Sequence, residues 1–162
     1  FGMHRVREFE RVIDRYVAAH RGQIQARLLP LALEVLAGHR ARGDRVVVAT
    51  GAPPELARSI LDFAGHGDVP VIGTAVGPRL GAMVATRHCH HEEKMRMLRE
   101  RGYGDIEVAY SDSSADLPLL RAARRPVVVN PKPGRVEAFR RVLPAGTPIL
   151  NWGCKDRAGD PV

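Results

Sequence analysis

The chain has 162 residues, which fits one domain with a sizeable apolar core, and its apolar share of 44% argues against wholesale disorder. No apolar run approaches the roughly 18 residues that a membrane-spanning helix needs, and no signal peptide is recognisable. The formal net charge of +7 favours anionic partners such as phosphorylated metabolites, acidic lipid surfaces or nucleic acid, while a solvated basic surface is the simpler interpretation.

The apolar residues in the first third of the chain recur mostly at helical spacing. They predict an amphipathic helix over 5–19 and a second helix over 31–42, with Pro30 at its first turn. The β-branched run over 45–50 ends at Gly51 and is typical of a strand that is buried on both faces. The rest of the sequence predicts, in chain order, a helix after Pro53–Pro54, a strand over 69–74, a β-hairpin over 76–87, a helix over 91–101, a strand over 106–110, a short helix over 117–123, a strand over 126–130, a helix over 135–142 and an edge strand over 148–152.

Strands that alternate with helices in this way predict an α/β fold with a largely parallel sheet. In such sheets, ligands bind in the crevice outside the carboxyl ends of the strands. Two predicted strands end directly in polar residues, one at Thr50-Gly51 and one at Ser111-Asp112. These two strand ends are therefore the first places to look for a functional site.

Asp112 and Asp116 follow the predicted strand over 106–110 within a Ser/Asp-rich loop. Two carboxylates at this point can converge on one hard cation, and Mg²⁺ takes only one or two protein carboxylates while keeping several waters. Asp112, nearest the strand end, is the better direct ligand, and Asp116 can support it or cap the following helix. The alternative interpretation is an ordinary Ser/Asp turn in which Asp116 is only a helix cap.

The hydroxyl of Thr50 and the backbone amide of Gly51 can together hold two oxygens of a phosphate group. Lys94 lies in the first turns of the predicted helix over 91–101, where its ammonium could neutralise phosphate charge and hold a carboxylate in place. Taken singly, Thr50 is also compatible with a plain strand end and Gly51 with a plain turn, and most lysines face solvent.

The order of Thr50, Lys94, Asp112 and Asp116 is more specific than any single member, and it resembles the second, third and fourth motifs of the haloacid dehalogenase superfamily. The segments over 46–53, 89–94 and 110–120 resemble subfamily IB in particular. That group includes phosphoserine phosphatases and a C-type bacterial phosphatidylglycerophosphatase. The sequence over 127–131 and a late Leu150-Asn151-Trp152 also resemble the end of subfamily IB proteins.

The resemblance implies a Rossmann-like three-layer sandwich with a mostly parallel sheet and part of a helical cap. It implies an Mg²⁺-dependent phosphohydrolase that works through an aspartyl-phosphate on a small phosphorylated metabolite or a phospholipid head group. Thr50, Gly51 and Lys94 are then expected to bind the phosphoryl group. Lys94 and Asp116 are expected to be catalytic, and Asp112 and Asp116 to hold Mg²⁺.

One departure from the family is large: its opening Asp-x-Asp-x-Thr motif, which carries the nucleophile, does not occur in these 162 residues. We therefore expect residues 1–30 to be the remainder of a helical cap and residues 31–152 to be the catalytic core without its first strand. Residues 153–162 are expected to form a polar tail. The resemblance implies that the nucleophile lies upstream of residue 1, on a strand between those over 46–50 and 106–110. Without that strand, two apolar strand edges would be left bare, which a stable domain avoids.

Two other classes of function remain open: a catalytically dead relative that binds anions or a partner protein, and a basic nucleic-acid-binding module. The second lacks aromatic side chains interleaved with the basic residues, so we expect no nucleic-acid partner.

A possible zinc site is suggested by the cluster of His88, Cys89, His90 and His91, but neighbouring residues rarely converge on one ion. We expect these residues to form a loop near the phosphate site instead. Cys89 and Cys154 lack disulfide or metal-type spacing, which favours a reduced, cytoplasmic setting. The expected location includes the inner face of the membrane.

Overall fold

The computed structural model describes residues 2–79 and 82–153 of the chain. Its helices are α1 (Gly2–Ala19), α2 (Arg21–Arg27), α3 (Pro30–Ala41), α4 (Pro54–Phe63), α5 (His91–Glu100), α6 (Leu117–Ala122) and α7 (Val136–Val142), with 3₁₀ turns η1 (Ser114–Asp116) and η2 (Pro133–Arg135). Its strands are β1 (Val48–Ala49), β2 (Val71–Ile72), β3 (Ala75–Arg79), β4 (Ala82–Arg87), β5 (Val108–Ser111), β6 (Arg125–Val129) and β7 (Ile149–Leu150). Apart from Gly153, the predicted polar tail lies outside the described residues.

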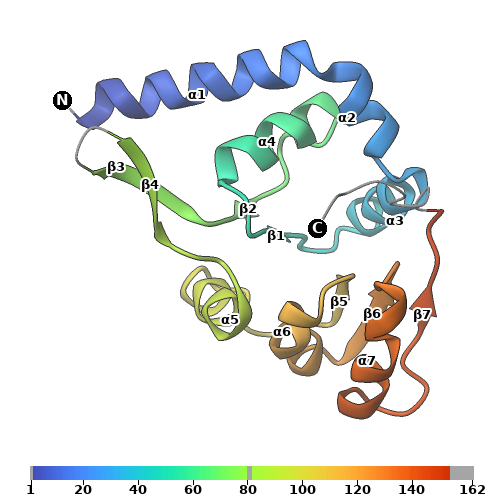
Figure 1. The fold of residues 1–162 in the computed structure, drawn as a ribbon. Coiled ribbons are helices and arrows are strands. Elements are labelled where there is room, and N and C mark those ends of the chain that lie inside the picture. The colour runs from blue at the N-terminus through green and yellow to red at the C-terminus, as the bar shows by residue number, and fades with distance from the viewer. Residues whose placement is uncertain (1, 80–81, 154–162) are drawn as a thin grey trace.

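The strands form two parallel sheets and one hairpin (Figure 1). β1 pairs with β2, and β5, β6 and β7 pair in that order, all in parallel. β3 and β4 form an antiparallel hairpin, which confirms the hairpin that was predicted for 76–87. The predicted α/β class with parallel strands is therefore confirmed.

The strand predicted over 45–50 is shorter in the structure than the sequence pattern suggests. Its backbone bonds to its neighbour run from Val48 N–H to the Pro70 carbonyl and from Thr50 N–H to the Ile72 carbonyl, both 2.9 Å. Within the described residues, β1 pairs only with β2 and β5 pairs only with β6. Each of these apolar strands thus has one edge without a ladder among the described residues.

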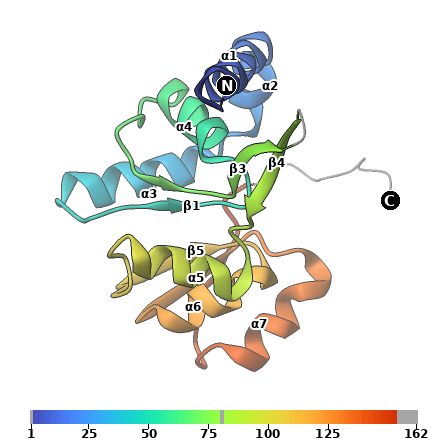
Figure 2. The ribbon, with the colours of Figure 1, turned by 90° about the vertical axis from the view of Figure 1, so that its left-hand side faces the viewer.

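Helix α5 joins the two sheets by packing against residues from both. Its buried Met95 and Leu98 share an apolar cluster with Ile72 of β2. Val47 on one side and Ile106 on the other pack against the same cluster. Figure 2 shows the two layers, with β1 in the upper one and β5, α5 and α6 in the lower one. α5 is therefore the element that sets the position of one strand end relative to the other.

Two polar contacts also bridge the layers. The guanidinium of Arg45 donates to the carbonyl of Gly102 at 2.9 Å and lies over the ring of Tyr103. On α3, His39 is hydrogen-bonded through Nε2 to the hydroxyl of Tyr110 at 2.9 Å. These contacts connect the residues flanking β1 with those flanking β5 although the two strands are not paired.

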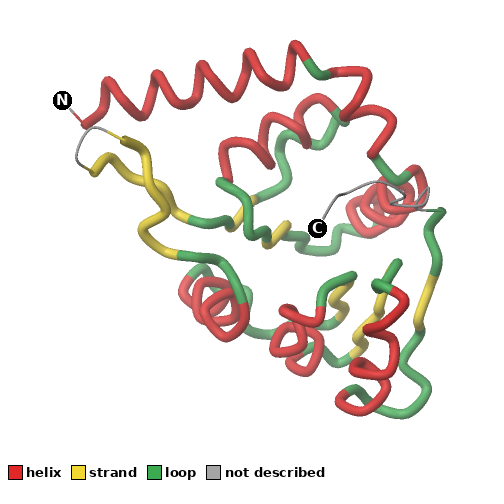
Figure 3. Tube along the Cα trace, viewed as in Figure 1, coloured by secondary structure: helices red, strands yellow, loops and turns green. Residues whose placement is uncertain are grey.

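Helix α1 lies along the outer side of α4 and the hairpin, as the helix trace in Figure 3 shows. Ile13 and Val17 form its buried stripe, while Val12 and Tyr16 are exposed. The period of its apolar residues follows the 3.6-residue turn, and this is why the helix was predictable from sequence. None of the described helices combines the length and the apolar character that crossing a bilayer requires.

A second apolar cluster holds the β5–β6–β7 sheet against α6 and α7. Phe139 of α7 is 1% exposed and packs there with Leu120, Val128 and Leu143.

We expect Phe139→Ala to lower the free energy of unfolding by about 3 kcal/mol or more, because it removes buried apolar surface and leaves a cavity. Urea denaturation measures this change. Val142→Ala, on the same helix but 42% exposed, is the control and should change stability by no more than about 0.5 kcal/mol; equal losses in the two variants would contradict the assignment of Phe139 to the core.

Candidate active site

The Ser/Asp loop after β5 is held by its own hydroxyl groups. The Ser111 hydroxyl accepts from the Ser113 backbone N–H at 3.1 Å, and the Ser113 hydroxyl accepts from the Ala115 N–H at 3.2 Å. Ser111 in turn donates to Asp116 Oδ2 at 2.8 Å. The loop therefore turns back so that the Asp116 carboxylate lies beside the end of β5.

The other oxygen of Asp116 is bonded to Lys94. The Nζ–Oδ1 distance is 2.5 Å, and both side chains are largely buried. Lys94 is only 4% exposed, so its ammonium is a charge that the fold must neutralise. The two residues predicted to be catalytic thus lie in direct contact, and Asp116 has both oxygens engaged by protein groups.

At the end of β1, Thr50 and Gly51 are held by a separate set of bonds. The Thr50 hydroxyl oxygen accepts from the Ala52 N–H at 3.1 Å, which leaves the hydroxyl hydrogen able to donate to a ligand. The buried hydroxyl of Thr74 donates to the Gly51 carbonyl at 2.6 Å. The same Thr74 oxygen accepts from the Cys89 N–H at 3.1 Å. Thr74 therefore ties the end of β1 to the segment that leads into α5.

Cys89 connects this segment electrostatically to both strand ends. Its pKa is raised, chiefly because the thiol is buried. The Lys94 ammonium and a backbone hydrogen bond from Thr50 act in the opposite direction, and the Asp116 carboxylate acts with burial. The Cys89 thiol thus lies near the backbone N–H of Thr50, and Thr74 ties the same segment to Gly51, so the start of α5, which carries Lys94, adjoins the end of β1.

Asp112 is exposed on the same loop, one residue after β5. Within residues 2–79 and 82–153 no group of three or more His, Cys, Asp or Glu side chains is placed to hold a metal ion. On this loop, Asp112 is exposed, whereas both carboxylate oxygens of Asp116 are engaged by Lys94 and Ser111.

The histidines before α5 do not form a metal site among the described residues. His88, His90 and His91 are all exposed, and the His90 ring lies against the backbone of Gly51. Sequence reasoning did expect this loop near the phosphate site. It gave no role to Thr74 or to the Ser111 hydroxyl, since a lone threonine at a strand end and a serine in a Ser-rich loop carry no distinctive signal.

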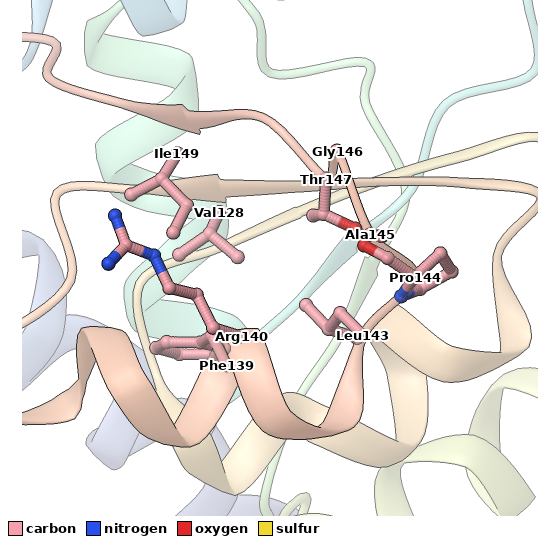
Figure 4. A pocket seen from close by; sticks show the side chains of 9 residues that line it. All are labelled: Val128, Phe139, Arg140, Leu143, Pro144, Ala145, Gly146, Thr147 and Ile149. Atoms are coloured by element: carbon pink, nitrogen blue, oxygen red, sulfur yellow. Dashed lines mark hydrogen bonds between the residues drawn. The ribbon is translucent and has the colours of Figure 1, made fainter.

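A depression of about 480 Å³ lies elsewhere, between β6, α7 and β7 (Figure 4). Its floor is formed by apolar side chains such as Val128 and Leu143, and Arg140 is the charged residue in its wall. None of the residues predicted for chemistry lines it. It is thus separate from the candidate site at the ends of β1 and β5.

The model of the haloacid dehalogenase-like hydrolase family matches residues 1–121. The chain belongs to this family.

Two curated relatives of this haloacid dehalogenase-like hydrolase come from strains of Mycobacterium tuberculosis, "Probable phosphatase Rv3661" and "Uncharacterized protein MT3761". Each is 33% identical over 130 residues, which is 75% of this chain and 43% of the relative. The chain therefore spans less than half the length of these relatives. The crystal structure of a protein of unknown function from Bordetella pertussis Tohama I shares the fold, with a TM-score of 0.63, 24% identity and coverage of 85% of this chain and 67% of the other.

The buried Lys94–Asp116 pair leads to a stability prediction. We expect Asp116→Ala to lower the free energy of unfolding by about 3 kcal/mol, because it leaves a buried ammonium without its counter-ion. The double variant Lys94→Met/Asp116→Leu should recover most of that loss, since both charges are removed together. Chemical denaturation measures both. A double variant as unstable as the single one would show that the loss comes from packing and not from the unpaired charge.

The raised pKa of Cys89 leads to a reactivity prediction. Because the thiolate is the reactive form, a raised pKa lowers the reactive fraction at pH 8, and burial further restricts access. We expect iodoacetamide to modify Cys89 far more slowly in the folded protein than in guanidinium chloride. Peptide mass spectrometry measures the two rates of modification. Equal rates in the two states would mean that the thiol is open to solvent.

Proposed function

We propose that this protein is an Mg²⁺-dependent phosphomonoesterase that acts through an aspartyl-phosphate intermediate. The observation that carries the proposal is the buried Lys94–Asp116 contact at the end of β5, on a helix whose leading segment Thr74 ties to the end of β1. A hydroxyl that can still donate, a buried ammonium and an exposed carboxylate at the neighbouring loop form a set suited to phosphoryl transfer. The name of one relative, a probable phosphatase, supports the same class.

The roles follow from the contacts of each residue. Thr50 and the Gly51 amide bind oxygens of the phosphoryl group, with Thr50 donating its free hydroxyl hydrogen. Lys94 supplies positive charge to the same group, and its ammonium is held in place by Asp116 at 2.5 Å. Asp116 is itself fixed by the Ser111 hydroxyl. The chain's own residues thus orient the phosphate before any bond is broken.

Asp112 is the residue that we propose as the direct ligand of Mg²⁺, with Asp116 as its support. Mg²⁺, when bound, neutralises charge on the phosphoryl oxygens. Asp112 is exposed at the loop after β5, where a carboxylate can meet both the ion and the phosphate. The phosphate-binding and cation-binding roles are thereby divided between the ends of two strands.

The nucleophile belongs to a further part of the proposal. We place it on a parallel strand between β1 and β5, where each of these strands has an edge that is unpaired among the described residues. Val48 and Ala49 are only half-buried, although their sequence is typical of a central strand. Residues 1–30 would then be part of a helical cap and residues 31–152 the core, as the sequence predicts.

The substrate class in the proposal is a small phosphorylated metabolite or a phospholipid head group, and the subfamily is IB. The charge of +7 supports an anionic substrate of either kind. A cytoplasmic setting belongs to the same proposal, supported by Cys89, a buried free thiol. p-Nitrophenyl phosphate serves as the first test substrate because it needs no knowledge of the leaving group.

The protein expressed from its whole gene should release phosphate from p-nitrophenyl phosphate in the presence of Mg²⁺ and lose this activity when Mg²⁺ is chelated. Asp112→Asn should lower kcat/KM by about a hundredfold, because it removes a charged ligand of the cation. Steady-state kinetics over a range of Mg²⁺ concentrations measures the effect.

Asp105→Asn is the matched control for this experiment. Asp105 lies on the neighbouring segment, its side chain is 81% exposed, and it pairs with Arg124 on the surface. We expect it to change activity by less than about twofold. Full activity in Asp112→Asn, or activity without any divalent cation, would exclude the proposed role of Asp112, and an inactive wild-type protein would exclude the proposed function.

A further inference from the structure

Gly51 is a glycine whose backbone does not require glycine. The glycines with positive φ are Gly43, Gly65, Gly102, Gly146 and Gly153, and Gly51 is not among them. What a side chain at Gly51 would meet is the ring of His90: an ideal Cβ would stand in contact with its Cε1, 2.8 Å from Nε2 and 3.2 Å from Nδ1. The absence of a side chain at position 51 is therefore what lets the imidazole approach this backbone.

The position of His90 is fixed from both sides. The preceding residue, Cys89, is fully buried, and its N–H is bonded to Thr74. On the other side, the His90 carbonyl accepts from the Lys94 N–H at 3.2 Å in the first turn of α5. The backbone from which the ring projects is therefore held beside the end of β1.

The imidazole nevertheless has no hydrogen-bonding task in the fold. Among the described residues no hydrogen bond to either ring nitrogen of His90 is found, and the ring does not cap α5. Its ring neighbours are His88 and His91, at centroid distances of 6.4 and 6.5 Å. A polar ring that is exposed, positioned and without a structural partner is suited to contact with a ligand.

We propose that His90 is a substrate-contacting residue that donates a ring N–H to an oxygen of the phosphoryl group bound at Thr50 and Gly51. This inference rests on the proposed function, because it takes Thr50 and Gly51 as the phosphate-binding backbone. The structure adds to that function a donor from the β4–α5 connection, which passes the end of β1 (Figure 2). Thr50, His90 and Lys94 then approach one anion from two elements.

The functional test compares three variants of the protein expressed from its whole gene. His90→Ala should raise KM for p-nitrophenyl phosphate and the inhibition constant of inorganic phosphate together, each by about tenfold, because one hydrogen bond to a charged group is lost. His90→Gln keeps an N–H donor and should recover much of the loss. His88→Ala is the matched control, an exposed histidine two residues away, and should stay within about twofold of wild type.

A structural test stands beside it and needs no activity. Gly51→Ala should displace the exposed His90 ring, since the new methyl group would overlap its Cε1, and should therefore shift the NMR resonances of the His90 ring protons. Unchanged ring resonances would overturn the contact. An active wild type whose KM is unchanged in His90→Ala would overturn the inference and leave the phosphatase intact, whereas an inactive wild type that binds no phosphate would remove the proposed function itself.

Discussion

A buried ammonium cannot remain in a fold without a counter-charge, and the Lys94–Asp116 pair meets this requirement. Lys94 is 4% exposed and its Nζ lies 2.5 Å from Asp116 Oδ1, so the energetic cost of burying the charge is offset only in this geometry. Because Lys94 is on α5 and Asp116 is in the loop after β5, the pair fixes the helix against the strand end.

The second constraint comes from Thr74, which with Lys94 makes up the buried polar side chains of the described residues. Its hydroxyl hydrogen goes to the Gly51 carbonyl and its oxygen accepts the Cys89 N–H, so both bonding capacities are used. Thr74 thus holds the end of β1 against the segment that begins α5. Two buried polar groups, one at each strand end, thus add to the apolar cluster around α5 in holding together two sheets that are not paired with each other.

Much of this arrangement could be predicted from the sequence, and the exceptions have a common cause. The helix over 5–19 was predictable because its apolar residues repeat with the helical period, and the hairpin over 76–87 because glycines separate short apolar stretches. The roles of Thr74 and Ser111 could not be predicted, since each depends on a partner that is distant in sequence or indistinct in a Ser-rich loop. Local patterns specify elements, whereas the partner of a single hydroxyl is set by tertiary packing.

The lengths of the strands also could not be predicted from local sequence alone. The run over 45–50 has the β-branched composition of a strand between two neighbours, yet only Val48 and Ala49 form a ladder. The helices α3 and α4 are also less buried than their composition suggests. Both carry apolar side chains, yet neither contains a fully buried residue.

The amino-acid composition of 45–50 suits a strand that is buried between two neighbouring strands. The ladder in the structure depends instead on which neighbouring strands are present. The pairing that composition suggests and the structure lacks is that along β1 and the edge of β5. At the same place, α5 and the hydrogen bond between His39 and Tyr110 connect the two layers. An extended segment placed there would pair with both strands and bring its own carboxyl end beside Thr50 and Asp112, because parallel strands end at the same edge of a sheet. The physical argument for a further strand and the chemical argument for a nucleophile therefore point to one location.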